Sequence, residues 1–295
     1  MNTHYSIKEL ELLSGIKAHT IRIWEQRYGL FHPERTSTNI RQYSSEDLKM
    51  LLNISLLNAN GFKISKLSKL SEAEIAKETL KILQVNKSVH ERMEGLKHAM
   101  LTFDEQLFVK IINEESFQDG FEKAMKNLIY PFLNLVGELW QTGAITPLHE
   151  HFISALIRQK LLAAIDRLPV PEQNLSKSFV LVCPEGEMHE IGLLYSNYMM
   201  RSRGVFTLYL GTNVPADDVV KIWHESGIKN MFLNVIVSNK KLNQFFEILH
   251  EGMSTNQNLY LSGTDVDILI PEKRLKNVLH LEKVDNLIEL LESKM

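Results

Sequence analysis

The segment FVLVCPEGEMHEIG, residues 179–192, sets the architecture of the C-terminal part of this chain. Its first residues, 179–183, form a continuous apolar run typical of a strand that is buried on both faces. A polar loop follows, and a helical pattern begins near Gly192. This order of strand, loop and helix predicts the first β/α unit of a parallel sheet.

Four further strand-like runs follow it, at residues 205–210, 230–237, 258–261 and 277–281. Helix-like stretches separate the first four strand-like runs, and the chain ends in the helical pattern DNLIELLES. Strands that alternate with helices predict a parallel sheet covered on both faces. We therefore expect a doubly wound, flavodoxin-like α/β domain over residues 179–295.

The preceding residues divide into three further zones. DRLPVPEQNLSKS, residues 166–178, contains two prolines and a polar run and is predicted to be a linker. Residues 76–165 show helical apolar periodicity, which predicts a four-helix bundle. Residues 1–71 hold short helical patterns that are interrupted by glycine and proline.

Charge is unevenly distributed along the chain. The 295 residues contain 33 Lys and Arg against 36 Asp and Glu, a net charge of −3. Residues 1–71 hold ten basic and six acidic side chains, net +4, which leaves 23 basic and 30 acidic ones, net −7, for the rest. A basic head on an acidic body predicts that the head contacts phosphate.

Composition excludes several classes of protein. An apolar content of 44% excludes wholesale disorder. The single cysteine, Cys183, excludes a disulfide framework, and no apolar run reaches the length of a membrane span. We therefore expect a cytoplasmic protein without a membrane partner.

The head has the pattern of a helix-turn-helix. Ser6 and Glu9 have capping-box spacing and open a first helix, which Gly15 ends. A short turn leads to a second helix, TIRIWEQRYG, from Thr20 onward. The second helix of such a pair can lie in the major groove of DNA. We expect four of its residues to face DNA or its phosphates: His19, Thr20, Arg22 and Arg27.

A polar turn, TSTN, follows between Arg35 and Arg41, and Tyr43 closes it, as in a small wing hairpin. The ordered motifs Thr-Ile-Arg-x-Trp-Glu, Tyr-Gly-Leu, Pro-x-Arg and Arg-x-Tyr resemble the winged-helix DNA-binding domain of the MerR family over residues 1–71. The resemblance implies contacts to double-stranded operator DNA from Arg22, Trp24, Arg35, Arg41 and Tyr43. For Trp24 and Tyr43 the alternative is a place partly in the core, and for Arg27 it is a solvated face. Because one winged helix reads few base pairs, we also expect self-association into a dimer or tetramer.

The loop after the first strand of the sheet carries Glu187 and His189. It has neither the dinucleotide fingerprint nor a Walker loop, so NAD and ATP are not expected. A histidine can ligate a metal through one ring nitrogen while an acid holds the other. Since no further ligands cluster here, the metal would be one already held by a macrocycle.

Glu187-x-His189-x-x-Gly192 resembles the Asp-x-His-x-x-Gly motif of cobalamin-binding domains, with Glu in place of Asp. The resemblance implies that His189 binds cobalt and that Glu187 is its partner. It also places Ser238 and Gly263 beside the nucleotide tail of the cofactor, although Lys240 and the pair Ser262-Gly263 depart from the family pattern. The alternative for His189 is a loop histidine without a ligand.

Within the predicted bundle, Trp140 is followed by nine residues and then by Glu150-His151. This spacing resembles the bundle of cobalamin-dependent MerR-type photoreceptor repressors, the CarH/LitR group. The resemblance implies that Trp140, Glu150 and His151 lie at the upper face of adenosylcobalamin, with Trp140 against the adenosyl group. Light-responsive members have a histidine directly after the Trp, whereas this chain has Gln141; His149 or His151 is an unproven substitute.

These patterns together predict a transcriptional repressor that senses adenosylcobalamin and light, with oligomerisation controlling operator binding. We do not expect an enzyme, because His149-Glu150-His151 lacks zincin spacing and no nucleophile elbow is present. Two alternatives stay open. One is a cofactor-independent MerR-type regulator that is controlled by a protein partner. The other is a corrinoid carrier subunit of a methyltransferase or mutase, which would have no use for a winged helix.

Overall fold

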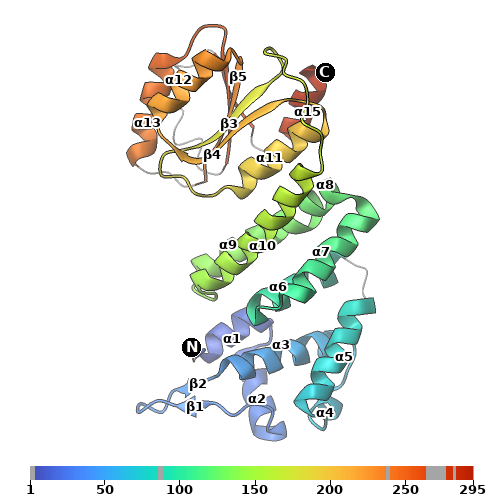
Figure 1. Cartoon of the computed structure of the whole chain (residues 1–295). Helices are drawn as coiled ribbons and strands as arrows, with labels where there is room; N and C mark the ends of the chain where they lie inside the picture. The colour runs from blue at the N-terminus through green and yellow to red at the C-terminus, as the bar shows by residue number, and fades with distance from the viewer. Residues whose placement is uncertain (1–3, 86–88, 237–239, 264–276, 282–283, 295) are drawn as a thin grey trace. The chain divides into compact units, whose positions relative to one another are not determined.

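The computed structural model describes residues 4–85, 89–236, 240–263, 277–281 and 284–294 (Figure 1). The chain forms two compact units, residues 1–153 and 154–295, and their boundary falls inside helix α10 (Pro147–Asp166). The first unit holds the winged helix and most of the bundle, and the second holds the α/β domain. The domain limits expected from the sequence, at residues 71, 165 and 178, stay predictions.

The head contains the helices and the hairpin that its sequence predicts. Its elements are α1 (Ile7–Ser14), α2 (Ala18–Tyr28), β1 (Glu34–Arg35), β2 (Arg41–Gln42), α3 (Ser45–Ala59) and α4 (Ile64–Leu67), and α5 (Glu72–Val85) follows the head. Ser6 and Glu9 cap α1 reciprocally, and Gly15 ends it in a left-handed conformation with φ 73°. Helix α2 begins at Ala18 rather than at Thr20, and β1 pairs with β2 as an antiparallel wing.

In the described residues from 89 onward, the helical region predicted as a bundle contains α6 (Val89–Thr102), α7 (Glu105–Asp119), α8 (Phe121–Ala124), the π-helical segment η1 (Met125–Ile129), α9 (Tyr130–Gln141) and α10. One helix of this region is a composite, made of α8, η1 and α9. The π-helical segment ends just before Pro131, which lies at the start of α9. Proline has no amide hydrogen to donate, so the helix accommodates it where the hydrogen-bond pattern changes.

The second unit is built on a five-stranded parallel sheet in the order β4-β3-β5-β6-β7. Its strands are β3 (Phe179–Pro184), β4 (Thr207–Val214), β5 (Asn230–Asn234), β6 (Asn258–Ser262) and β7 (Val278–His280). Its helices are α11 (Ile191–Ser202), α12 (Ala216–Ser226), α13 (Lys240–Gly252) and α15 (Val284–Lys294). This is the strand order of the flavodoxin-like fold, which confirms the predicted fold class.

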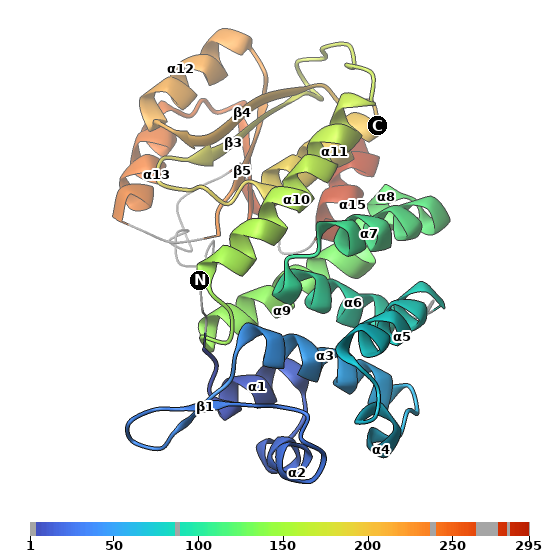
Figure 2. The ribbon, with the colours of Figure 1, turned by 60° about the horizontal axis from the view of Figure 1, so that its bottom comes forward.

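Helices cover both faces of this sheet. Helices α12 and α13 lie on one face, and α11 and α15 lie on the other, in both views of the ribbon (Figures 1 and 2). The core under α12 and α13 includes Val180 and Val182 of β3, Trp223 of α12 and Phe245 of α13. The chain reverses its direction of winding between β3 and β5, so the loops after these two strands meet at the switch point where such folds bind ligands.

Candidate functional site

The second helix of the head has one buried and one exposed face. Ile21 and Trp24 are buried, whereas His19, Arg22 and Arg27 are exposed and Thr20 is half-buried. The exposed Arg27 guanidinium also lies 5.5 Å from the centre of the Tyr28 ring. Four of the residues that the sequence assigned to DNA therefore share one accessible side of α2, and Arg35 is exposed on the wing.

The structure corrects the prediction for two aromatic residues. Tyr43 is fully buried, and only 7% of Trp24 is exposed. Both side chains belong to the core of the head, which was the alternative considered for them. Burial, together with the Glu25 carboxylate, raises the pKa of the Tyr43 hydroxyl. In this structure both side chains are thus largely inaccessible at the surface of the head.

Glu25 joins the wing to the recognition helix. The Arg41 Nε atom donates to both Glu25 carboxylate oxygens, at 3.0 and 3.2 Å, and the Tyr43 hydroxyl donates to Oε2 at 3.0 Å. Since Arg41 and Glu25 are both largely shielded from water, this pair is stronger than an exposed ion pair. Arg41 is thus a wing anchor in this structure, and its predicted contact with DNA stays untested.

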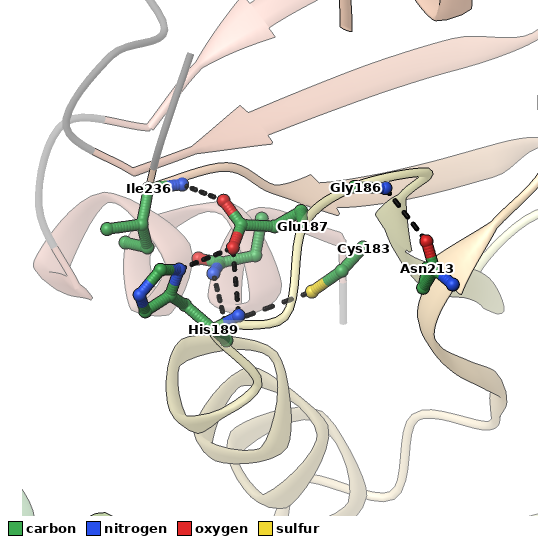
Figure 3. Close-up of polar contacts among 7 residues, drawn as sticks. Cys183, Gly186, Glu187, His189, Asn213 and Ile236 are labelled. Carbon is green, nitrogen blue, oxygen red and sulfur yellow. Dashed lines mark hydrogen bonds and ion pairs between the residues drawn. The ribbon is translucent and has the colours of Figure 1, made fainter. Parts of the chain in front are cut away.

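In the second unit, Glu187 holds His189 in one orientation (Figure 3). Glu187 is almost completely buried, and its Oε1 atom accepts from the His189 backbone amide at 2.8 Å and contacts Nδ1 at 2.6 Å. The His189 side chain is 56% exposed. Because Glu187 engages Nδ1, Nε2 is the ring nitrogen that could coordinate a metal.

The strands on either side of β3 fix the same loop. The amide of Ile236, just after β5, donates to Glu187 Oε2 at 2.7 Å, so this carboxylate spans the switch point (Figure 3). On the other side, Asn213 of β4 makes two hydrogen bonds to the loop. Its side-chain oxygen accepts from the Gly186 backbone amide at 2.9 Å, and its backbone amide donates to the Glu187 backbone carbonyl at 3.2 Å. The loop is therefore held by both neighbouring strands.

Asn234, which the sequence reading did not single out, positions the backbone of His189. It ends β5, is buried, and donates through Nδ2 to the His189 carbonyl at 3.3 Å. A Cβ atom added to Gly192 would lie 2.7 Å from Asn234 Oδ1, so the glycine of the motif gives this side chain its space. No local sequence signal pointed to it, because Asn234 is far from His189 along the chain.

Of the two residues predicted to lie beside a nucleotide tail, the structure describes only Gly263. Ser238 lies outside the described residues. Gly263 follows β6 with φ 128°, and a Cβ atom there would lie 1.6 Å from the Val235 carbonyl oxygen. Only glycine fits this position, where the chain passes close to the end of β5.

Cys183 lies beneath the same loop. Its thiol is completely buried and is 3.9 Å from the His189 carbonyl oxygen. Burial, with the nearby carboxylates of Glu187 and Glu190, raises the pKa of this thiol. A thiol that stays protonated is a poor nucleophile and a poor metal ligand, so Cys183 packs rather than reacts.

The predicted cap residues belong to the first unit. Trp140 is 56% exposed near the end of α9, so it is not a core residue of that unit. Glu150 is half-buried, and His151 is exposed, with its Nδ1 atom 2.9 Å from Glu150. These three side chains therefore have accessible surface.

His149 has a structural role. It is buried, stacks on Phe103 with ring centres 4.8 Å apart, and accepts from the Thr146 amide through Nδ1 at 3.2 Å. Burial lowers the pKa of His149, so the ring is neutral near pH 7. It caps the start of α10 and is a poor candidate for a second cobalt ligand.

The residues of the second unit fit the lower side of a corrinoid. The donor set is one half-exposed histidine whose other nitrogen is held by a buried acid, which suits a single bond to a metal that a macrocycle already holds. Gly192 and Gly263 stand where a larger residue would collide with Asn234 and Val235. Within the described residues, no group of three His, Cys, Asp or Glu side chains could hold a bare metal ion.

Comparison with known proteins finds family matches for the head and for the bundle. A model of the MerR HTH family of regulatory proteins matches residues 5–74, and a model of a B12 binding domain matches residues 92–164, within the bundle. The HTH-type transcriptional repressor CarH of Myxococcus xanthus is 30% identical over 73% of this chain and 73% of its own. The chain belongs to the MerR family, with CarH.

Two other relatives are similar to this MerR-family protein over different shares of the chain. The repressor CarA of M. xanthus is 27% identical over 71% of this chain and 69% of its own. The regulator MlrA of Escherichia coli is 36% identical over only 24% of this chain and 29% of its own. The MerR-family protein described here is thus a DNA-binding transcriptional regulator with a cobalamin-binding region.

A solved structure supports the fold of the remaining part. The monomethylamine corrinoid protein of Methanosarcina barkeri aligns with a TM-score of 0.52 and 14% identity, over 70% of this chain and all of its own. At this identity the likeness shows the shared fold alone.

Among the described residues, no helix is long and apolar enough to span a membrane.

Proposed function

We propose that this protein is a repressor whose affinity for its operator is controlled by adenosylcobalamin, with His189 as the lower cobalt ligand. We also propose that light acts on the bound cofactor and that the resulting change in self-association alters the affinity for operator DNA. Several heads on one operator would multiply a modest affinity of each head. The observation that carries the proposal is the 2.6 Å contact that holds Nδ1 of His189 against the buried Glu187.

The chain's own residues have distinct tasks in this proposal. His189 presents Nε2 to cobalt, and Glu187 keeps the ring in the required tautomer. Trp140, with its large exposed apolar face, shields the upper side of the cofactor from water. When bound, adenosylcobalamin supplies a cobalt–carbon bond that light can break.

Gln141 sets this chain apart from the light-responsive members that the Trp-x9-Glu-His spacing resembles. An amide is a poor cobalt ligand, and His149 is occupied in capping α10. His151 is exposed and paired with Glu150, which supports it over His149 as a substitute. We propose that the illuminated state is held less tightly than in a protein with histidine at this position.

Visible spectroscopy tests the cofactor site. The purified protein, incubated with adenosylcobalamin in the dark and passed over a gel-filtration column, should retain a cobalamin spectrum. His189→Ala should change that spectrum, while the control His224→Ala, an exposed histidine on α12, should not. An unchanged spectrum in His189→Ala would remove this residue from cobalt ligation.

Failure to retain cobalamin alongside intact operator binding would favour the cofactor-independent regulator. Cobalamin retention without salt-dependent DNA binding would favour a corrinoid carrier. Gel filtration of the loaded protein before and after illumination tests the output. Identical elution volumes would refute light-controlled self-association while leaving cofactor binding intact.

A further inference from the structure

The exposed face of α2 carries two residues that no motif assigned to DNA, Ile23 and Gln26. Ile23 is 47% exposed, although its neighbours Ile21 and Trp24 are buried, and Gln26 is exposed as well. An isoleucine that is half exposed on the accessible side of a short helix, among arginines, is not part of the buried core of the head. Its position instead suits an apolar contact with a partner.

Helical geometry places these residues in one row. At 3.6 residues per turn, each residue turns the helix by about 100°. His19, Ile23 and Gln26 then fall within an arc of about 60°, with Arg22 at one edge and Arg27 at the other. The opposite side holds Ile21, Trp24 and the half-buried Glu25, whose bonds to Arg41 and Tyr43 attach the wing.

Side-chain chemistry distinguishes the row from its edges. Guanidinium groups at the edges suit phosphate oxygens, which flank the groove on both sides. In the major groove, an apolar side chain fits the methyl group of thymine, and a glutamine can make two hydrogen bonds to adenine. Ile23 and Gln26 are about 4.5 Å apart along the helix axis, and base pairs stack about 3.4 Å apart, so both side chains reach the same or adjacent pairs.

We propose that His19, Ile23 and Gln26 form the base-reading row of α2, with Ile23 against a thymine methyl and Gln26 on an adenine. Each half-site of the operator then contains one A·T pair or two adjacent ones beneath this row. Arg22 and Arg27 contact phosphate and do not select sequence. The inference rests on DNA binding by the head and is independent of the cofactor proposal.

Selection from a random DNA library tests the row. The full-length protein, with and without added cobalamin in the dark, is used to select from duplexes with a randomised core, and the enriched half-sites are sequenced. Gln26→Ala and Ile23→Ser should each weaken the preference for A·T at one position by about 10-fold. Gln26→Glu should shift that position toward cytosine, because a carboxylate accepts from the cytosine amino group.

Arg27→Ala is the matched control on the same helix. It should weaken binding to all sequences alike and lower the salt dependence by about one unit of slope. All four substitutions are at exposed positions, and thermal unfolding verifies that each variant is folded. Unchanged base preferences in Gln26→Ala and Ile23→Ser would overturn the proposal. So would a wild-type motif with G·C pairs at these positions, or no motif at all, and the last result would also remove sequence-specific DNA binding.

Discussion

At the scale of single residues, the carboxylate of Glu187 explains how a surface loop holds a histidine still. A buried carboxylate is costly unless hydrogen bonds compensate for lost water. Glu187 accepts from the amide and the ring of His189 and from the amide of Ile236. All three partners act as donors to Glu187, so both of its side-chain oxygens must be hydrogen-bond acceptors.

We predict that Glu187→Gln destabilises the α/β unit and weakens cobalamin binding. The amide group must face one of these donors, which should cost about 2 kcal/mol of folding free energy. Loss of the held tautomer should lower cobalamin affinity about 10- to 100-fold. Urea unfolding and cobalamin titration measure the two effects. Glu185→Gln, in the same loop but paired with Lys241 at the surface, is the control, and equal behaviour of the two variants would refute the role of Glu187.

Gly263→Ala should be far more destabilising than Gly204→Ala. Both glycines have positive φ, but a Cβ atom at Gly204 meets nothing within 4 Å, whereas one at Gly263 would overlap the Val235 carbonyl. We expect about 1–2 kcal/mol for Gly204→Ala and about 2–5 kcal/mol for Gly263→Ala. Unfolding midpoints in urea compare the two variants directly. Similar midpoints would mean that the end of β6 adjusts without cost.

The sequence predicted only part of this site, for a physical reason. Glu187 and His189 are two residues apart, and the resemblance of this stretch to the Asp-x-His-x-x-Gly motif predicted the contact that the structure shows. Asn234 and the Ile236 amide reach the same loop from β5, and a tertiary contact of this kind has no local sequence pattern. In the head, the arginine-rich surface of α2 was predicted, but a single sequence cannot distinguish a buried tyrosine from an exposed one.

At the scale of secondary-structure elements, α3 of the head and α6 of the bundle are joined by a buried polar contact. His98 Nε2 lies 2.8 Å from Asn53 Oδ1, and Asn53 is buried. Burial lowers the pKa of His98 from 6.5 to about 4, outweighing the opposing effect of Asp104, while Lys49 adds to the lowering. The contact is therefore between neutral groups at pH 7.

We predict that this histidine makes the head–bundle unit less stable in acid. In the unfolded chain His98 takes up a proton near pH 6.5, but in the folded chain only near pH 4. The unfolded state therefore binds more protons between these values, and stability is lost as the pH falls from 6.5 towards 4. At pH 5 the loss from this residue is about 2 kcal/mol.

His98→Gln isolates that effect, because glutamine can still donate to Asn53 and does not titrate. The difference in unfolding free energy between wild type and variant should change by about 2 kcal/mol in favour of the variant from pH 7 to pH 5. His224→Gln, on the exposed side of α12, controls for the loss of a histidine. A wild-type minus His98→Gln difference that stays constant with pH would contradict the assignment.

Element boundaries show where pattern reading reaches its limit. The apolar run predicted a strand over 230–237, yet β5 ends at Asn234. Beyond it the Val235 amide donates to the Ser262 carbonyl, and the Ile236 amide donates to the Glu187 carboxylate instead of to a strand. Conversely, β4 extends past the predicted residue 210 to Val214, because β3 pairs with it as far as Pro184. Pairing partners, not the strand's own sequence, set both ends.

At the scale of the whole molecule, positive charge is concentrated in the head. Residues 1–71 carry a net charge of +4, whereas the remaining residues carry −7. The body therefore repels DNA, and attraction depends on the number of heads that reach one operator. The predicted contacts include three exposed arginines in each head: Arg22, Arg27 and Arg35.

The salt dependence of DNA affinity can therefore show how many heads bind one operator. With about three phosphate contacts per head, the slope of log affinity against log salt should be about −3 for each head engaged. If self-association places two or more heads on an operator, the loaded protein in the dark should show at least twice the slope of the illuminated protein. Filter binding at several salt concentrations, on DNA selected by the full-length protein, measures both slopes. Equal slopes with different affinities would mean that the cofactor alters each head itself, and the proposed role of self-association would be wrong.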